Sequence, residues 1–475
     1  MTDDPDAATV RRLAAILDLP VDDDVVAAAL NRFRDLSALA GDPPPRSDSS
    51  AVSEGQVPDD EYNALLAVYD EPRTTRDEGP LAGTTVAVKD NVAVRGLRMT
   101  AGVPEFEYVP SFDATVVERL LNAGAGILGK ANLDAFAFGP AGEWSEFGDP
   151  VNPVAPGHIP GGSSSGSGAA VAGGLTDAAL GTDTGGSVRV PAACCGLVGV
   201  KPTHRLVPRF GFTGNAPSLD VIGPLTPDVG TAARMLDAMA GPDPRDPTTV
   251  PVDPGAVAGG VGADDLRVGL VESALDLVSN PLAAAVREAA ERLAESEDAA
   301  VEPVALEFGD VDEAYAVIVA AEFAWYRRQR FAVRGEGFQY DRELRAALGD
   351  VPLTRHVAER VLPGALADEV TDGAAYVGAR EVRDDFRERV DARLADLDAL
   401  LLPTMRSLPP EFGTVSGGVG GNYSLTKPFS VYGGPAVSVP VGPVDGLPVG
   451  VQVVTPHFED GFALRVARRL ERAVA

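Results

Sequence analysis

The sequence predicts an α/β fold in which helices cover both faces of a central sheet. Short apolar stretches rich in β-branched residues alternate with amphipathic stretches along most of the 475 residues. Strands that alternate with helices in this way are typical of α/β proteins. Apolar residues make up 45% of the chain and charged residues 23%, and 52 Gly and 39 Pro supply many turns. This composition is ordinary for a globular protein.

The first 60 residues are expected to form a helical extension and a linker. Residues 5–40 are predicted to form two helices, and apolar residues such as Val26 and Leu30 recur in the second at helical spacing. Residues 41–60 are rich in Pro, Ser and acidic side chains and show no periodicity, which is typical of a linker.

Residues 61–475 are expected to form the main domain. Its strands are predicted at 84–88, 127–128, 266–271, 400–401 and 435–441. Its helices are predicted at 113–124, 164–174, 281–296, 311–335, 366–396 and 458–474, with a second linker at 241–263. The helical stretch 311–396 is expected to be an insert or cap over the sheet, and 398–475 to return to the sheet.

The charge balance excludes several classes of partner. Asp and Glu number 70 and Lys and Arg number 40, which gives a net charge of −30. A protein that binds nucleic acid through its phosphates needs a basic surface, and an anionic membrane would repel this chain. The sequence shows no signal peptide and no apolar run of about 20 residues, so a soluble cytoplasmic protein is expected.

Cysteine, histidine and lysine are all scarce. Two adjacent cysteines, Cys194 and Cys195, and four scattered histidines do not supply a clustered metal site or a disulfide framework, so we expect no metal. Only four lysines occur, and the other basic residues are Arg. Strong acidity with little lysine favours adaptation to a salty cytoplasm, since salt screens self-repulsion. An ordinary acidic protein from a GC-rich genome is the alternative.

Residues 160–203 form the most unusual segment, in which Gly-Gly-Ser turns interrupt apolar material. Packed turns of this kind present backbone N–H groups that bind anions or a developing oxyanion. The phosphate-loop pattern with its lysine is absent, so a nucleophilic serine fits better. Ser164 lies at the centre of a Gly-x-Ser-x-Gly match, but the strand that should precede it is missing.

Such a serine needs a base, and the four histidines show no partner pattern. Lys89 ends a buried strand in the segment VAVKDN. Burial lowers the pKa of a lysine, so that its neutral amine can accept a proton, whereas Arg stays charged. A lysine at a strand end usually only contacts solvent and has no chemical role. Because this chain contains only three other lysines, a functional role for Lys89 is more plausible than usual.

Three motifs in order, VAVKDN, PGGSSSGSGAAVAGG and GTDTGGSVRVPA, resemble the core of the amidase signature family. The match is close over 75–245, the expected catalytic core, and loose over 398–455. The serine turns lie 24 residues apart. The resemblance implies a mixed β-sheet with helices on both faces, no cofactor, and hydrolysis of a small-molecule amide. Family members are often dimers, so a homodimer is one expectation.

The family's Ser–cis-Ser–Lys triad maps onto Lys89 as base, Ser163 as bridging serine after a cis peptide bond, and Ser187 as nucleophile. The backbone N–H groups of the oxyanion hole map onto 184–187, namely Thr184, Gly185, Gly186 and Ser187. Asp183 and Arg189, which flank the nucleophile, are expected to pair and shape the loop, and Ser164 to support it by hydrogen bonds. Cys194, Cys195, Lys130 and Lys201 are expected to be structural.

The family also contains the A subunit of a glutamine-dependent aminoacyl-tRNA amidotransferase, which releases ammonia for a partner protein. Here Tyr423 stands where that protein carries Asp, Ser430 stands where it carries Asn, and residues 321–331 depart from its pattern. Arg360 is aligned weakly with its substrate-binding Arg. These departures favour a stand-alone amidase, and the alternative is the A subunit. A binding protein with an inactive site is a third interpretation, which the intact triad disfavours.

Overall fold

The computed structural model describes residues 6–16, 22–37, 55–106, 108–251, 266–296, 299–328, 354–415, 421 and 424–475. Residues 41–54 of the first predicted linker and 252–263 of the second therefore lie outside the described residues, as do Tyr423 and residues 329–335 of an expected helix. The prediction of a linker is wrong for residues 241–251, because Asp243 and Asp246 are buried against the body. No helix of the described ranges is long and apolar enough to cross a membrane.

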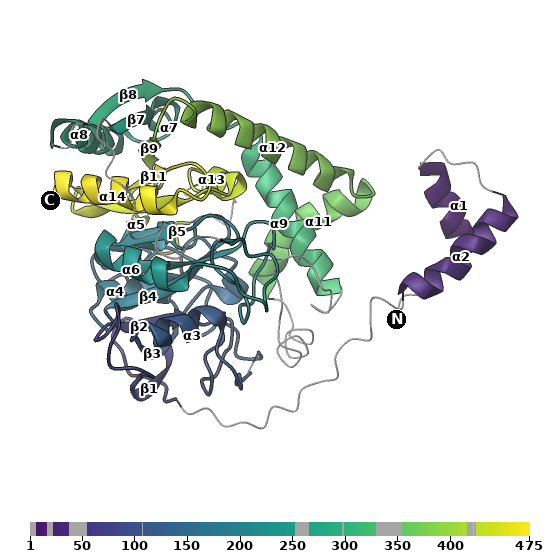
Figure 1. The fold of residues 1–475 in the computed structure, drawn as a ribbon, viewed down its shortest axis with the longest axis horizontal. Coiled ribbons are helices and arrows are strands. Elements are labelled where there is room, and N and C mark those ends of the chain that lie inside the picture. The colour runs from purple at the N-terminus through teal and green to yellow at the C-terminus, as the bar shows by residue number, and fades with distance from the viewer. Residues whose placement is uncertain are drawn as a thin grey trace.

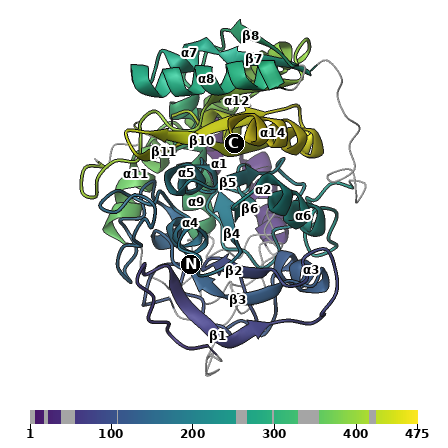
Figure 2. The same cartoon turned by 90° about the vertical axis from the view of Figure 1, so that its left-hand side faces the viewer.

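A mixed sheet of 11 strands forms the centre of the molecule, in the order β1-β3-β2-β4-β6-β5-β10-β11-β9-β7-β8 (Figures 1 and 2). The predicted class, a central mixed sheet covered by helices, is confirmed. The strands are β1 (Leu65–Arg73), β2 (Thr85–Lys89), β3 (Gly126–Ala131), β4 (Ala178–Asp183), β5 (Val198–Lys201), β6 (Val221–Thr226), β7 (Leu266–Val271), β8 (Ala299–Val304), β9 (Ala399–Pro403), β10 (Ala436–Val444) and β11 (Leu447–Val454).

Alternating side chains of the strands build a core on each face of the sheet. Val86 and Val88 of β2 join the larger apolar cluster, whereas Ala87 between them joins a second cluster on the opposite face. The larger cluster packs beneath α3 (Thr115–Asn122), α6 (Val229–Met239), α8 (Asn280–Ser296) and α14 (Asp460–Val474). The opposite face is covered by α4 (Ser165–Ala172), α5 (Arg189–Cys195) and α13 (Lys427–Tyr432).

The helical stretch expected as a cap contains α9 (Val311–Arg328), α11 (Arg355–Val370) and α12 (Ala374–Leu394). These helices lie side by side and contact one another beside the sheet (Figure 1). The single helix predicted at 366–396 is wrong, because the chain turns at Gly373, whose φ of +87° is open to glycine, and α11 begins 11 residues earlier.

The predicted helical extension contains α1 (Ala7–Ile16) and α2 (Asp23–Ser37), which contact each other. The last residues of the predicted linker are part of the sheet's edge, since Gln56 exchanges two backbone hydrogen bonds of 2.8 Å with Val68 of β1. The division of the chain at residue 60 stays a prediction.

Candidate active site

Lys89 and Ser163 are in direct hydrogen-bond contact. Lys89 is the last residue of β2 and is fully buried. Its Nζ lies 2.8 Å from Ser163 Oγ and 2.9 Å from Thr182 Oγ1 on the neighbouring strand β4. Ser163 follows a cis peptide bond, Gly162–Ser163, as the sequence resemblance implied. The parallel pairing of β2 with β4 thus aligns the lysine with the segment that leads to the second serine turn.

The surroundings of Lys89 favour the neutral amine. Burial lowers the pKa of Lys89 from 10.5 to about 7, although the charges of Asp134, Asp183 and Asp220 oppose this shift. A lysine with such a pKa is neutral in a large fraction of molecules at neutral pH. It can then accept a proton from a hydroxyl to which it is hydrogen-bonded.

Ser187 lies in the short turn between β4 and α5, four residues after Asp183. The Asp183 carboxylate holds this turn, because it accepts from Gly186 N at 2.7 Å and from Val188 N at 3.3 Å. Ser187 is 7% exposed, and its hydroxyl has no hydrogen-bond partner within the described residues. The turn is therefore fixed by its neighbours and not by the serine side chain.

Arg189 clamps the Asp183 carboxylate from the other side. Its Nε and a terminal nitrogen each donate to a different carboxylate oxygen at 3.0 Å, a bidentate pair that is fully buried. The charge of Arg189 holds the pKa of Asp183 below its usual value in spite of burial. The expected pairing of these residues thus takes the form of a buried ion pair.

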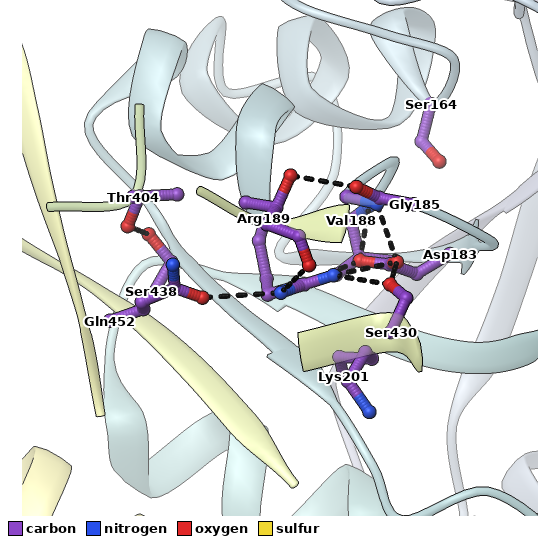
Figure 3. Close-up of polar contacts among 12 residues, drawn as sticks. Ser164, Asp183, Gly185, Val188, Arg189, Lys201, Thr404, Ser430, Ser438 and Gln452 are labelled. Carbon is purple, nitrogen blue, oxygen red and sulfur yellow. Dashed lines mark hydrogen bonds and ion pairs between the residues drawn. The ribbon is translucent and has the colours of Figure 1, made fainter. Parts of the chain in front are cut away.

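The C-terminal part of the chain completes the clamp (Figure 3). Arg189 also donates to Ser430 Oγ at 2.8 Å, Gln452 Oε1 at 3.1 Å and the Thr426 carbonyl at 3.0 Å. The Thr426 hydroxyl donates to the carbonyl of Gly185 at 2.7 Å. These bonds connect α13 and β11 to the serine turn, although they lie more than 230 residues away in the sequence.

One of the four expected oxyanion-hole groups is already engaged. The Gly186 N–H points at Asp183, which corrects the expectation that it faces the substrate. The N–H groups of Thr184, Gly185 and Ser187 make no backbone hydrogen bond in the described part of the chain. At Gly185 a side chain would not fit, since a Cβ there would lie 2.4 Å from the Tyr315 hydroxyl of α9.

Comparison with known proteins decides the family. The family model described as Amidase matches residues 57–464. The chain belongs to the amidase signature family. It is 41% identical to the A subunit of the glutamyl-tRNA(Gln) amidotransferase of Haloarcula marismortui, over 86% of this chain and 99% of that protein. It is also 41% identical to the protein of the same name from Halobacterium salinarum, over 83% and 96% of the two chains.

Solved structures of amidase-family proteins superpose on the same fold. The A subunit of glutamyl-tRNA(Gln) amidotransferase from Thermotoga maritima is 34% identical, with a TM-score of 0.73 over 86% of this chain and 87% of that one. A 6-aminohexanoate cyclic dimer hydrolase is 30% identical, with a TM-score of 0.69 over 84% and 86%. The peptide amidase of Stenotrophomonas maltophilia is 30% identical, with a TM-score of 0.62 over 83% of each chain.

Three polar residues of the candidate site were not identified from the sequence. Thr182, beside Asp183, shares the Lys89 amine with Ser163. Asp134 lies against the cis turn, where it accepts from Gly142 N and Trp144 N, and burial raises its pKa to about 6. Burial likewise raises the pKa of Asp220 to about 7, and this carboxyl accepts from the Thr184 hydroxyl. The one signal in the sequence for these residues is that they lie in segments that resemble the amidase signature family.

Ser164 does not act as a helix cap. Its Oγ accepts from Thr182 N at 3.3 Å and lies 3.4 Å from the Thr182 carbonyl, so it ties the start of α4 to β4. In Figure 3 it lies apart from the Asp183 clamp. Cys194 and Cys195 are buried free thiols whose pKa values burial raises. Lys130 is also buried and forms an ion pair of 3.1 Å with Asp90.

The cap helices bring further side chains toward the cis turn. Arg360 of α11 lies 4.3 Å above the Trp144 ring, and its charge opposes the rise in the pKa of Asp134.

The Ser430 hydroxyl of α13 accepts a hydrogen bond from Arg189, so it is part of the clamp. Within the described ranges no group of three or more His, Cys, Asp or Glu side chains could hold a metal ion.

Proposed function

We propose that this protein hydrolyses a carboxylic amide through a serine acyl-enzyme, with Ser187 as nucleophile, Ser163 as proton relay and Lys89 as base. The observation that carries the proposal is the Lys89 amine, which is buried, has a pKa lowered to about 7, and lies 2.8 Å from Ser163 Oγ. Arg could not replace it, because its guanidinium stays charged.

In the proposed reaction Ser187 Oγ attacks the amide carbonyl carbon. Its proton passes to Ser163 Oγ while the Ser163 proton passes to the neutral Lys89 amine. The N–H groups of Thr184, Gly185 and Ser187 stabilise the oxyanion, and preorganised donors of this kind contribute about 3–4 kcal/mol each.

Collapse of the tetrahedral intermediate breaks the C–N bond. The proton returns through Ser163 to the leaving nitrogen, which departs as ammonia or an amine. Water then attacks the acyl-enzyme, gives its proton to the same relay, and releases the carboxylic acid.

Glutamine is the first substrate to test, with the chain acting as the A subunit of an amidotransferase. The relatives from Haloarcula marismortui and Halobacterium salinarum carry that name, and the first is matched over 99% of its length. Arg360 near the cis turn is a suitable partner for a substrate carboxylate. The comparisons thus favour this alternative over the stand-alone enzyme that the sequence departures suggested.

A stand-alone amidase remains the second candidate, because Ser430 replaces the Asn of the A-subunit pattern. The Ser430 hydroxyl is buried and accepts from Arg189, so this position belongs to the clamp.

The experiment measures ammonia release in molar KCl from glutamine and from aliphatic and aryl amides. The chain is assayed alone and after co-expression with amidotransferase partner subunits. Glutamine turnover that requires the partners supports the A subunit, whereas turnover of simple amides by the chain alone supports the stand-alone enzyme. Ser187→Ala is expected to abolish either activity, and a fully active Ser187→Ala protein would refute the proposed mechanism.

A further inference from the structure

A cavity of about 810 Å³ lies between the cap helices and the body, away from the proposed triad. It is lined by α9, α11, α12 and loops near residues 204, 217, 433 and 457, and none of Lys89, Ser163 and Ser187 lines it. Its volume is in the range of ligand-binding pockets. We call it the arginine cavity, after the four arginines in its lining: Arg205, Arg380, Arg383 and Arg387.

Three of these arginines form a stripe on one face of α12. Arg380, Arg383 and Arg387 are spaced by three and four residues, so they point the same way and extend over about 10 Å of helix. Like charges at this spacing repel one another. Burial first and the charge of Arg383 second lower the pKa of Arg387, consistent with a concentrated positive charge.

The described carboxylates in the lining form no ion pair with the stripe, although the charge of Asp391 opposes the lowering of the Arg387 pKa. Glu322 accepts from the Ser218 hydroxyl at 2.6 Å, from Ser218 N at 3.0 Å and from the Tyr376 hydroxyl at 2.8 Å. Asp391 accepts from the Tyr432 hydroxyl at 3.0 Å. Asp368 accepts from a backbone N–H at 3.3 Å. In the described part of the chain, no ion pair joins a lining arginine to a lining carboxylate.

Two of the arginines, Arg383 and Arg387, share one carboxylate outside the lining. Asp384 lies 3.2 Å from Arg383 Nε and 3.6 Å from Arg387, and its side chain is 59% exposed. The side chain of Arg383 itself is only 8% exposed. One half-exposed carboxylate thus serves two arginines, and Arg380 forms no ion pair within the described residues, so a bound anion would find unshared positive charge here.

The cavity also offers aromatic surface. Trp325 of α9 and Phe458 are large apolar side chains of its lining that stay 44% and 46% exposed. A planar ring stacks well on such side chains, while phosphate groups suit a row of guanidinium groups. A compact ligand that combines an aromatic ring with two or three phosphates matches both parts of the cavity.

We propose that the arginine cavity binds a nucleoside di- or triphosphate, with the phosphates on Arg380, Arg383 and Arg387 and the base on Trp325 and Phe458. This site is separate from the amide site and does not depend on the proposed hydrolysis.

The test is isothermal titration calorimetry of the full chain with ADP, adenosine and pyrophosphate at constant high ionic strength. Saturable binding of ADP is expected, with pyrophosphate weaker and adenosine weakest. Arg380→Gln and Arg383→Gln should each weaken ADP binding about tenfold or more, since each removes a charge-assisted contact. Trp325→Ala should weaken ADP but leave pyrophosphate unchanged.

Arg393→Gln is the matched control, because Arg393 is exposed on the same helix but outside the cavity. The Arg393→Gln protein should bind ADP as the unchanged protein does. Ser187→Ala should also bind ADP normally, which separates this site from the amide site. Absence of saturable ADP binding, or binding unaffected by Arg380→Gln and Arg383→Gln in folded proteins, would overturn the proposal. The proposal would also be overturned if the protein bound the 3′ end of an RNA but showed no measurable binding of ADP.

Discussion

All four lysines of this chain are buried, at 0% exposure for Lys89 and Lys130, 1% for Lys201 and 3% for Lys427. Surface basic positions are occupied by arginine instead. The sequence therefore allowed Lys89 to be selected as a candidate base, because a residue kept against a strong compositional bias has a reason to be there. The sequence did not distinguish it physically from Lys201, whose pKa burial also lowers to about 7.

The pH dependence of catalysis tests the assignment of Lys89. The base acts when neutral, so kcat/KM is expected to rise with pH and level off above about 7. Asp220→Asn removes a carboxyl that is partly ionised near pH 7 and then favours the charged amine, so the rise should move to slightly lower pH. Initial-rate profiles between pH 5 and about 9 measure both effects.

Lys201→Met provides the control for that profile. Lys201 has the same lowered pKa but bonds the carbonyls of Pro202 and Gly434, outside the proposed relay. If kcat/KM of Lys201→Met still rises near pH 7, the titrating base is Lys89. If Lys201→Met loses this rise, the titration belongs to Lys201 and the assignment of Lys89 is contradicted.

At the scale of single elements, the serine turn between β4 and α5 depends on a clamp that joins distant parts of the chain. The sequence could predict that Asp183 and Arg189 pair, because they flank the nucleophile. It could not predict the bonds to Thr426, Ser430 and Gln452, since only the fold brings those residues to Arg189.

Removing the Arg189 side chain of this clamp should lower both the stability of the protein and its kcat. Arg189→Met leaves the buried Asp183 carboxylate without a countercharge, which is expected to lower the free energy of unfolding by about 3–5 kcal/mol. It also loosens the carboxylate that fixes Gly186 N, so kcat should fall. Guanidinium unfolding curves measure the first effect.

Arg292→Met is the matched control, because its ion pair with Glu288 is exposed and such pairs contribute less than about 1 kcal/mol. Equal losses of stability in the two variants would contradict the assigned role of the buried clamp.

Strands β4, β5, β6 and β8 were not predicted, because their composition or short length obscures the apolar pattern that marks a strand. The predicted strand at 84–88 carries alternating valines, but β4 is built of Ala, Leu and Gly inside a Gly- and Ser-rich segment. β6 contains Gly and Pro, and β5 has only four residues. Pro303 lies in the partly exposed edge strand β8, where a proline weakens a strand signal.

At the scale of the whole molecule, the mixed sheet and its helical cover followed from alternating elements and the family resemblance. The order of the strands did not, because it depends on pairings between segments such as β5 and β10 that lie over 230 residues apart. The arginine cavity was also not predictable from the sequence, since its lining comes from three helices and four loops that lie far apart along the chain.

Salt dependence tests the interpretation of the acidic composition. A net charge of −30 repels itself, and salt screens this repulsion. Tm is therefore expected to rise when KCl increases from dilute buffer to molar concentration, as measured by differential scanning fluorimetry. Highest stability in dilute buffer would favour the alternative of codon bias over adaptation to salt.

The most direct test of the central claim is to locate the acylating serine by covalent labelling. The protein is treated with a fluorophosphonate probe, digested and sequenced by mass spectrometry. We predict one label on Ser187, no label in Ser187→Ala, and much slower labelling in Lys89→Arg, where the relay lacks a base. A label on another residue, or unchanged labelling of Lys89→Arg, would contradict the Ser187–Ser163–Lys89 mechanism.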